Sequence, residues 1–403
     1  MTSAFGWLDS DEDQRKKMLE VVELFKDEGT VDELGIGSIR DTIANSLFPG
    51  TSVLHTRIRY VLFVPWLLKQ SVAKPDSPQM LTELRRLEIR LIHSLLTGYK
   101  DQPVASPPGV IGGSARDKLK RMPSAAYWVV LRRWNIRRAD TTVEGFFRQA
   151  KGQRALARLT TQTDDPEARD SGPLMALDPN LPDPPPDLLK STTFDLTADE
   201  EAYLSDLLTT STRGSLLAWL VRNQATNDPD HVWQLDNYEE FPSSNRRVVE
   251  HGRRFHTAIY GAPLLYNLLL AERKLNPDLA DEYRAELQTW RDDLNVTQAL
   301  VDWERTGFWS MIHAHNPTLT PLTRRFVDAW LDLINSDADV ADSASARDLV
   351  SRRERQIKGG RSRLANQAAL DRWSGRSGLV PLDYKWRIAR RFLQDLYRAR
   401  GAE

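Results

Sequence analysis

Apolar positions recur at three- and four-residue spacings along most of the chain, whereas the two-residue alternation of a half-buried strand is scarce. Such spacing places apolar side chains on one face of a helix. The clearest faces consist of three sets of residues: Leu84, Leu87, Leu91 and Leu95; Tyr283, Leu287, Trp290 and Leu294; and Ile388, Phe392, Leu393 and Leu396. The pattern predicts a mainly α, multi-helical protein.

Helix-start signals support this prediction at several points. Thr197 followed by Glu200 has the spacing of a capping box, and Thr320-Pro321 supplies a cap and a first-turn proline. Thr51 or Ser52 is expected to cap a helix through Val64 that is too continuously apolar for a surface helix. That segment is therefore predicted to be a buried helix.

A proline-rich, acidic stretch interrupts the helical pattern between Gln162 and Thr193. Its composition resists both helix and core formation. The prolines are Pro166, Pro173, Pro179, Pro182, Pro184, Pro185 and Pro186. We expect two helical domains or lobes, residues 1–160 and 194–403, joined by a connector over 161–193.

Composition limits the class of protein. With 403 residues, 40% hydrophobic content and 12 tryptophans, the chain can bury a substantial core. The absence of cysteine excludes disulfides, thiolate metal sites and a cysteine nucleophile. The N-terminus turns acidic at once, and the longest apolar run, Tyr60 to Leu68, is far shorter than the ~20 residues that span a bilayer. We expect a cytoplasmic protein without a membrane segment.

The net charge of −1 hides strong local segregation. From Arg347 to Arg400 fifteen Lys/Arg stand against five acids, and from Thr161 to Thr210 twelve acids stand against two basic residues. Such clusters suggest separate partner surfaces or docking of one segment on the other; the alternative is that they disperse over a solvated surface on folding.

The first basic region surrounds a predicted helix pair near 124–150, with a turn at Asn135. A helix-turn-helix here, with Trp128, Leu131, Trp134 and Ile136 in its core, would present a basic surface to DNA. An ordinary helical pair is the alternative. The candidate nucleic-acid-binding residues are Arg116, Lys118, Lys120, Arg121, Arg132, Arg133, Arg137 and Arg138.

The second basic region lies near the C-terminus and combines a Gly-Gly loop with the last helix. Its array of cations is suited to phosphate backbones, and an acidic protein surface would be an equally good partner. The candidates are Lys358, Arg361, Arg363, Lys385, Arg387, Arg390 and Arg391.

Arg57 and Arg59 stand within the predicted buried helix, where an unpaired charge is costly. One interpretation is a pair of buried salt bridges with acids such as Asp32, Glu33 or Asp41. The other is an anion pocket, because arginine forks match phosphate oxygens.

Several blocks resemble an uncharacterised bacterial family, a domain of unknown function, over nearly the full length. The blocks are Phe5-Gly-Trp-Leu-Asp9, Val31–Asp41, Phe48-Pro-Gly-Thr-Ser52, Thr56–Trp66, Ala262–Glu272 and Leu382–Arg387. The resemblance implies a companion of helicases, nucleases and ATPases in anti-phage gene clusters. It carries no catalytic residue over to this chain.

Catalytic motifs are weak. Asp371, Asp383 and Lys385 vaguely resemble a metal-dependent nuclease arrangement, and no serine elbow or ATPase phosphate loop occurs. No cofactor or metal site is expected. The sequence therefore favours a non-catalytic subunit of an anti-phage defence assembly. Such a subunit would bind nucleic acid, DNA more than RNA, or a partner protein. The alternative is a metal-dependent nuclease acting on phage DNA.

Overall fold

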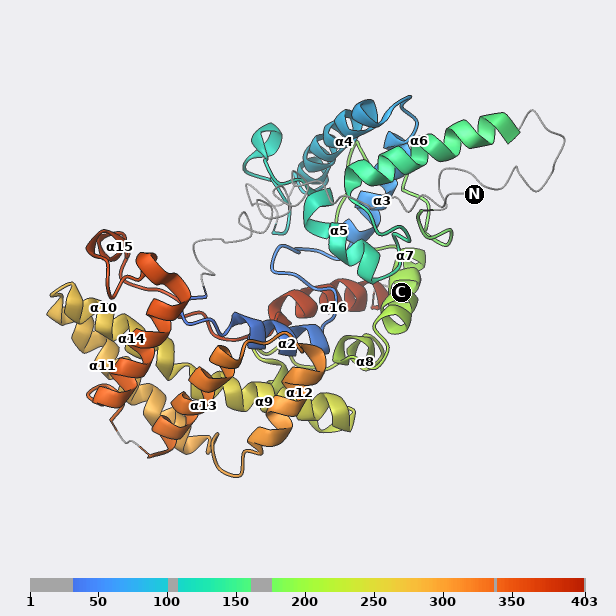
Figure 1. The fold of residues 1–403 in the computed structure, drawn as a ribbon. Coiled ribbons are helices and arrows are strands. Elements are labelled where there is room, and N and C mark those ends of the chain that lie inside the picture. The colour runs from blue at the N-terminus through green and yellow to red at the C-terminus, as the bar shows by residue number, and fades with distance from the viewer. Residues whose placement is uncertain (1–31, 101–107, 161–175, 337–338, 402–403) are drawn as a thin grey trace, which may run out of the picture. The chain divides into compact units, whose positions relative to one another are not determined.

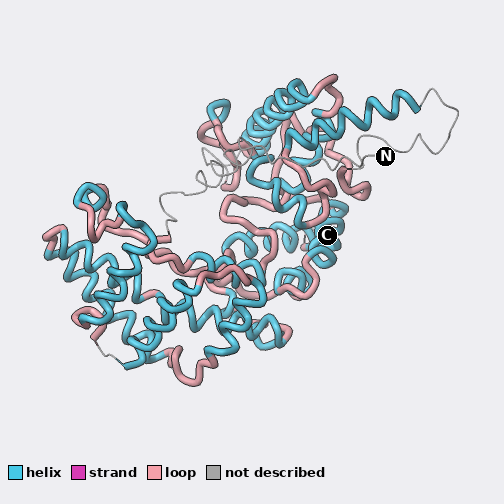
Figure 2. Tube along the Cα trace, in the orientation of Figure 1, coloured by secondary structure: helices cyan, strands magenta, loops and turns pink. Residues whose placement is uncertain are grey.

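The structure is helical throughout its described part. It is a computed structural model that describes residues 32–100, 108–160, 176–336 and 339–401. Within these ranges helices are joined by loops (Figure 2), and the nearest feature to a sheet is one isolated antiparallel bridge between Arg137 and Leu177. None of the described helices is both long and apolar enough to cross a bilayer. The predicted mainly α, multi-helical fold is confirmed.

Two compact units are interleaved along the chain. Unit 1 comprises Met1–Thr42 and Glu250–Leu382, and unit 2 comprises Ile43–Val249 and Asp383–Glu403. The units differ from the predicted domains, because the expected boundary at 161–193 lies within unit 2 and the last helix joins a unit formed mostly by earlier residues. Composition marks where a chain resists helix formation, but it does not show which distant segments pack together.

Unit 2 is a set of helices around the buried helix α3. α4 and α5 pack against α3, α6 packs against α4, and α16 packs against α7 and α8. The elements (Figure 1) are α3 (Tyr60–Ser71), α4 (Ser77–Gly98), η1 (Arg116–Lys118), α5 (Pro123–Arg133), α6 (Val143–Thr160), α7 (Ala198–Ser211), α8 (Leu216–Arg222), η3 (Val232–Gln234), η4 (Tyr238–Glu240) and α16 (Trp386–Arg400).

Helix α3 begins later than the sequence predicts. Residues 53–59 form a loop, and Val53 is 60% exposed. Ahead of the helix, the Thr51 hydroxyl donates to the Phe48 carbonyl, and the Ser52 N–H donates to His55 Nδ1. Thr51 and Ser52, the two expected caps, are thus engaged in local turns and not in a helix start at residue 53. From Tyr60 to Leu68 every side chain except Pro65 is aromatic or aliphatic, and all nine residues are buried. The predicted buried helix covers this stretch as far as Val64.

The second half of the predicted connector is docked on unit 2. Leu177, Leu181 and Leu188 are buried. Trp66 Nε1 donates to the Pro182 carbonyl at 2.6 Å, and Ser94 Oγ donates to the Leu188 carbonyl at 2.7 Å. Prolines prevent a helix here, but the buried leucines and the carbonyl bonds to α3 and α4 hold the segment in place. Residues 161–175 of the connector lie outside the described part.

Unit 1 has α10 at its centre, with ten of its thirteen residues buried. α11 and α14 pack against α10, and α13 packs against α14. The elements are α2 (Gly37–Leu47), which begins in unit 1, α9 (Ser243–Ile259), which ends in it, α10 (Gly261–Arg273), α11 (Pro277–Val296), α12 (Arg305–His315), α13 (Pro321–Ser336), α14 (Ala344–Lys358), η5 (Gly359–Arg361) and α15 (Gln367–Asp371).

Helix limits in both units follow the predicted signals. Thr197 and Glu200 form the capping box that starts α7, and Thr320 Oγ1 accepts from the Thr323 N–H at the start of α13. Helix α14 ends at Gly359, whose φ of 53° lies in the left-handed region that glycine adopts without strain.

Replacing Leu188 by alanine should test the docking of the proline-rich segment. The change empties a buried site, so we expect the free energy of unfolding to fall by about 2–5 kcal/mol. Lys190→Ala, at an exposed position of the same segment, should change it by less than about 0.5 kcal/mol. Urea titrations followed by tryptophan fluorescence measure both. Equal, small effects would show that the segment is not docked.

Candidate nucleic-acid interface

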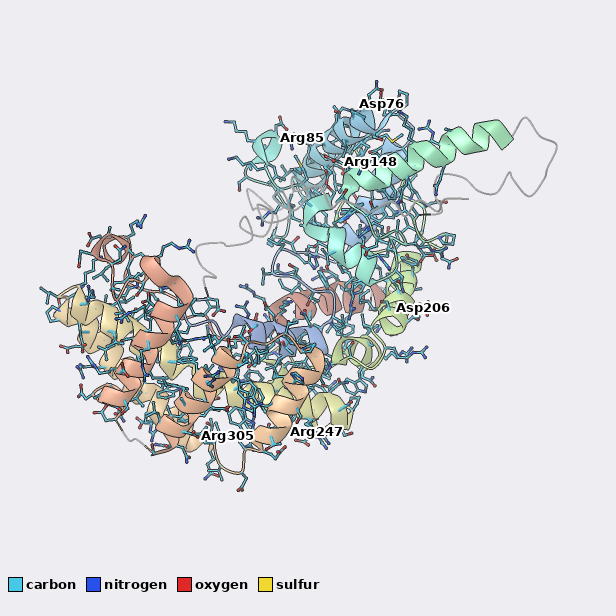
Figure 3. All side chains as sticks on the ribbon, viewed as in Figure 1. Asp76, Arg85, Arg148, Asp206, Arg247 and Arg305 are labelled. Carbon is cyan, nitrogen blue, oxygen red and sulfur yellow. The ribbon has the colours of Figure 1, made fainter. Side chains whose placement is uncertain are left out.

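A basic surface of unit 2 combines one side of α4 with the loop that carries η1. Arg85 and Arg90 are exposed on α4, and Arg116, Lys118 and Lys120 are exposed on the loop. We call these five residues the α4–η1 surface. Figure 3 labels Arg85 at the surface of α4.

Contacts between the loop and α4 hold the cations of the loop near Arg85. Arg85 Nη2 donates to the Leu119 carbonyl at 3.3 Å, and His93 Nε2 lies 3.1 Å from Asp117 Oδ1. Gly112 enters the loop with a φ of +83°, where a Cβ would collide with Leu119. The loop therefore has a defined path along the helix.

Helix periodicity explains why Arg85 and Arg90 are exposed. Asp76 caps α4 by accepting from the Gln79 N–H at 2.9 Å, and the predicted leucine face is buried. Once Leu84, Leu87 and Leu91 face the core, residues 85 and 90 lie on the solvent side. Sequence reasoning missed both arginines, although the leucine spacing contained this signal.

Acidic residues do little to neutralise the surface. Glu83 is bonded to Arg86 at 2.6 Å. Glu88 is buried and accepts from the Ser124 N–H at 2.6 Å, at the start of α5. Burial raises the pKa of Glu88 to about 7, against the opposing effect of its Ser124 hydrogen bonds. Asp117 is the one acid in the loop from Ser114 to Lys120.

The predicted helix-turn-helix region has a different geometry. α5 ends at Arg133 and α6 starts at Val143, so the connection is longer than the three- or four-residue turn of that motif. The connection is fixed by its own contacts. Asn135 adopts a φ of 62°, and Trp134 Nε1 donates to the Pro49 carbonyl at 3.0 Å. The helices and the turn at Asn135 occur where the sequence predicts them, but the connection is too long for a helix-turn-helix.

The basic residues of this region differ in exposure. Arg132, Arg133 and Arg138 are exposed, Arg121 is half-buried, and Arg137 is buried. The Arg137 guanidinium lies 4.3 Å from the centre of the Trp128 ring and donates to backbone carbonyls. Arg137 is therefore not part of the surface.

The C-terminal candidates Lys358, Arg361 and Arg363 belong to unit 1, where two of them are bound to acids. Lys358 pairs with Glu33 and with Glu354, the latter at 3.1 Å. Arg363 Nη1 lies 2.7 Å from Glu33 Oε1. Burial raises the pKa of Glu354, but hydrogen bonds from Ser362 and Arg363 and the Lys358 charge outweigh that effect and lower it. Only Arg361 of the three is exposed.

The remaining C-terminal candidates, Lys385, Arg387, Arg390 and Arg391, belong to unit 2. Lys385 Nζ donates to Asn45 Oδ1 at 2.9 Å, and Arg391 Nη1 to the Thr56 carbonyl at 3.5 Å. Arg390 pairs with Asp228 at 3.4 Å and Asp230 at 3.5 Å. Arg387 is exposed. The predicted C-terminal set is thus divided between two units, and much of it is bound within the protein.

Arg57 and Arg59 each form a buried ion pair in unit 2. The Arg57 guanidinium binds the Asp395 carboxylate of α16, with Nη2 2.6 Å from Oδ1 and Nε 3.0 Å from both carboxylate oxygens. Arg59 Nη2 lies 2.7 Å from Glu200 Oε1, and its Nη1 donates to the Thr193 carbonyl. Both residues are paired, as the first interpretation requires.

The partner acids are not the expected ones. Asp32 instead caps the start of α2 by accepting from the Ile36 and Gly37 N–H groups, Glu33 binds Lys358 and Arg363, and Asp41 pairs with its neighbour Arg40. The acids near Arg57 and Arg59 in sequence are used in unit 1, and acids 141 and 338 positions away take their place.

The residues of the nuclease alternative are divided between the two units, although the Lys385 N–H donates to Asp383 Oδ1 at 3.0 Å. Asp371 ends α15 of unit 1 and accepts from Gln367, whereas Asp383 and Lys385 belong to unit 2. Among the described residues no three His, Asp or Glu side chains are grouped so that they could hold a metal ion. No observation here favours metal-dependent cleavage.

Comparison with known proteins gives one match. A model of a family of unknown function, DUF6361, matches residues 2–400. The chain belongs to this family. No curated protein and no solved structure matches it. Membership of DUF6361 confirms the resemblance to a family of unknown function and assigns no role to any residue.

Replacing Arg57 by alanine should destabilise this DUF6361 member by about 3–5 kcal/mol, because the buried Asp395 carboxylate loses its counter-charge. The double variant Arg57→Met/Asp395→Leu should lose much less, since it removes both charges. Arg40→Ala breaks an exposed pair and should cost no more than about 1 kcal/mol. Chemical denaturation of the three variants would contradict the account if Arg57→Ala and Arg40→Ala had equal effects.

Proposed function

We propose that the protein is a non-catalytic subunit that binds the phosphate backbone of nucleic acid through the α4–η1 surface. The observation that carries the proposal is the placement of five exposed cations on a helix and a loop that contact each other. Such an array offers several phosphate contacts at once, and these supply most sequence-independent affinity.

The state of the neighbouring acids supports this proposal. A carboxylate among the cations would repel phosphate. Glu83 is bonded to Arg86 and Glu88 is buried, so Asp117, which lies 3.1 Å from His93, is the one exposed acid beside the cations of the loop. In contrast, ion pairs with Glu or Asp already occupy Lys358, Arg363 and Arg390. Phosphate would have to compete with those carboxylates. The α4–η1 surface is therefore the better site.

The wider role is an extension of the same proposal. The resemblance of the sequence to proteins that accompany helicases, nucleases and ATPases supports a place in a cytoplasmic anti-phage defence assembly. A subunit that binds nucleic acid without cleaving it needs such a partner to supply the reaction. DNA is the favoured ligand, and an acidic protein surface is the competing occupant of the same cations.

Binding to duplex DNA should weaken with salt, because each neutralised phosphate adds ~0.9 to the slope of log affinity against log salt. Arg85→Ala/Lys118→Ala should flatten that slope by about 1.8, which is two contacts at this value, on unrelated sequences alike. Fluorescence anisotropy over a series of salt concentrations measures it.

Arg355→Ala/Arg372→Ala is the matched control, because it removes two exposed arginines of unit 1. Its slope should equal that of the unmodified protein. If the unmodified protein shows no salt-dependent binding to DNA or RNA at low salt, the proposal is wrong and the surface belongs to a protein partner.

A further inference from the structure

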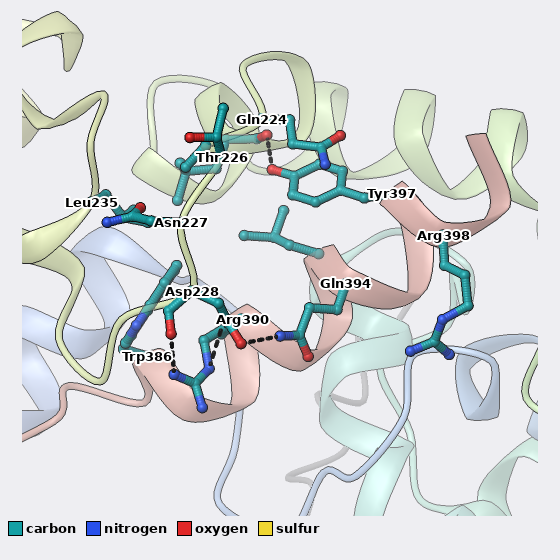
Figure 4. A pocket seen from close by; sticks show the side chains of 13 residues that line it. Gln224, Thr226, Asn227, Asp228, Leu235, Trp386, Arg390, Gln394, Tyr397 and Arg398 are labelled. Carbon is teal, nitrogen blue, oxygen red and sulfur yellow. Dashed lines mark hydrogen bonds and ion pairs between the residues drawn. The ribbon is translucent and has the colours of Figure 1, made fainter. Parts of the chain in front are cut away.

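A pocket of about 450 Å³ opens in unit 2 between α16 and the loop that follows α8 (Figure 4). The loop contributes Gln224 to Asp228, and the helix contributes Trp386, Arg390, Gln394 and Arg398 among others. The volume lies within the range of about 300–1,000 Å³ typical of small-ligand sites. None of the nucleic-acid contacts proposed above lies in it.

The loop wall of the pocket is fixed to the helix. Asp228 accepts from Gln394 Nε2 at 2.9 Å and pairs with Arg390. The Pro229 carbonyl accepts from Arg390 at 2.6 Å and from Trp386 Nε1 at 3.0 Å. Because these bonds join loop and helix, the pocket exists before any ligand enters.

Apolar groups form its floor. Leu220 and Leu393 are buried beneath it, and Leu235 closes one end. The Tyr397 ring lies against the floor, and its hydroxyl donates to the Leu220 carbonyl. The leucines of the floor are almost fully covered, so the Tyr397 ring is the group on which a planar ring system could stack.

Two polar side chains at the rim have no bond to the rest of the described protein. Gln224 and Arg398 are exposed, and neither side chain makes a hydrogen bond or ion pair within the described residues. The Gln394 side-chain amide donates a hydrogen bond to Asp228, so its carbonyl oxygen can still accept one from a ligand. The rim therefore offers an amide that donates and accepts, a second acceptor, and a guanidinium for an anion.

A row of cations continues from the pocket along α16. One face of the helix carries residues at spacings of four, three and four, namely the cations Arg387, Arg391 and Arg398 and, between the last two, Gln394. Arg387 is exposed and Arg391 half-buried. An anionic chain entering the pocket at Arg398 would meet further cations in this direction.

We propose that the pocket takes one unstacked base of a single-stranded nucleic acid. The base stacks on Tyr397 and bonds through its polar edge to Gln224 and Gln394, while Arg398 binds the adjoining phosphate. The inference deepens the proposed function, on which it rests, by naming a single strand as the ligand of this face. An unstacked base needs a stacking surface and amide groups at its edge, and the pocket has both.

The test compares a short single strand with an abasic strand of the same length, each titrated into the full chain by calorimetry. The single strand should bind about tenfold more tightly. Gln224→Ala/Arg398→Ala should abolish that difference and leave duplex binding by the α4–η1 surface unchanged. Arg213→Ala, an exposed arginine elsewhere in unit 2, is the control and should change neither.

Adenosine monophosphate, titrated alone, separates this inference from the proposed function, because a mononucleotide does not require the α4–η1 surface. Saturable binding that Gln224→Ala/Arg398→Ala weakens about tenfold or more would support the pocket even if duplex DNA did not bind. Equal affinity for the intact and abasic strands, together with no binding of the mononucleotide, would overturn it and leave the backbone proposal standing.

Discussion

The burial of the Arg57–Asp395 ion pair is the constraint on which unit 2 depends. Their side chains are 13% and 2% exposed, so the Asp395 carboxylate has almost no access to water and depends on Arg57 for its counter-charge. The pair joins the loop before α3 to the last helix, 338 positions away. Around it Tyr127 binds the backbone of Thr56 and Arg57, and His55 stacks between Tyr127 and Phe392 of α16. The C-terminal helix is therefore part of the core.

Local signals predicted the helices well, because periodicity and capping are properties of neighbouring residues. The leucine face of α4 and the capping box of α7 both follow from the sequence. The interleaved units and the docked segment 176–193 depend on contacts between distant residues. The pattern of prolines and acids does not indicate that Leu188 is buried and bonded to Ser94 of α4, so the sequence predicts a connector for this segment.

The candidate site was predicted only in part, for a related reason. Counting lysines and arginines finds where cations are dense but not which ones are paired. Lys358 and Arg390 lie in a stretch rich in lysine and arginine, but in the fold both are paired with acids. Arg85 and Arg90 lie outside the basic stretches of the sequence, but α4 exposes both and places Arg85 beside the η1 loop. What distinguishes the two groups is the position of carboxylates from other parts of the chain.

Hydrogen–deuterium exchange of the full chain, with and without duplex DNA at low salt, tests most directly where nucleic acid binds. We expect slower exchange in the loop from Ser114 to Arg121, because bound nucleic acid would cover its exposed residues. Exchange around Lys358–Arg363 should stay the same, because those cations already hold Glu33 and Glu354. Slower exchange at Lys358–Arg363 with no change at Ser114–Arg121 would contradict the account.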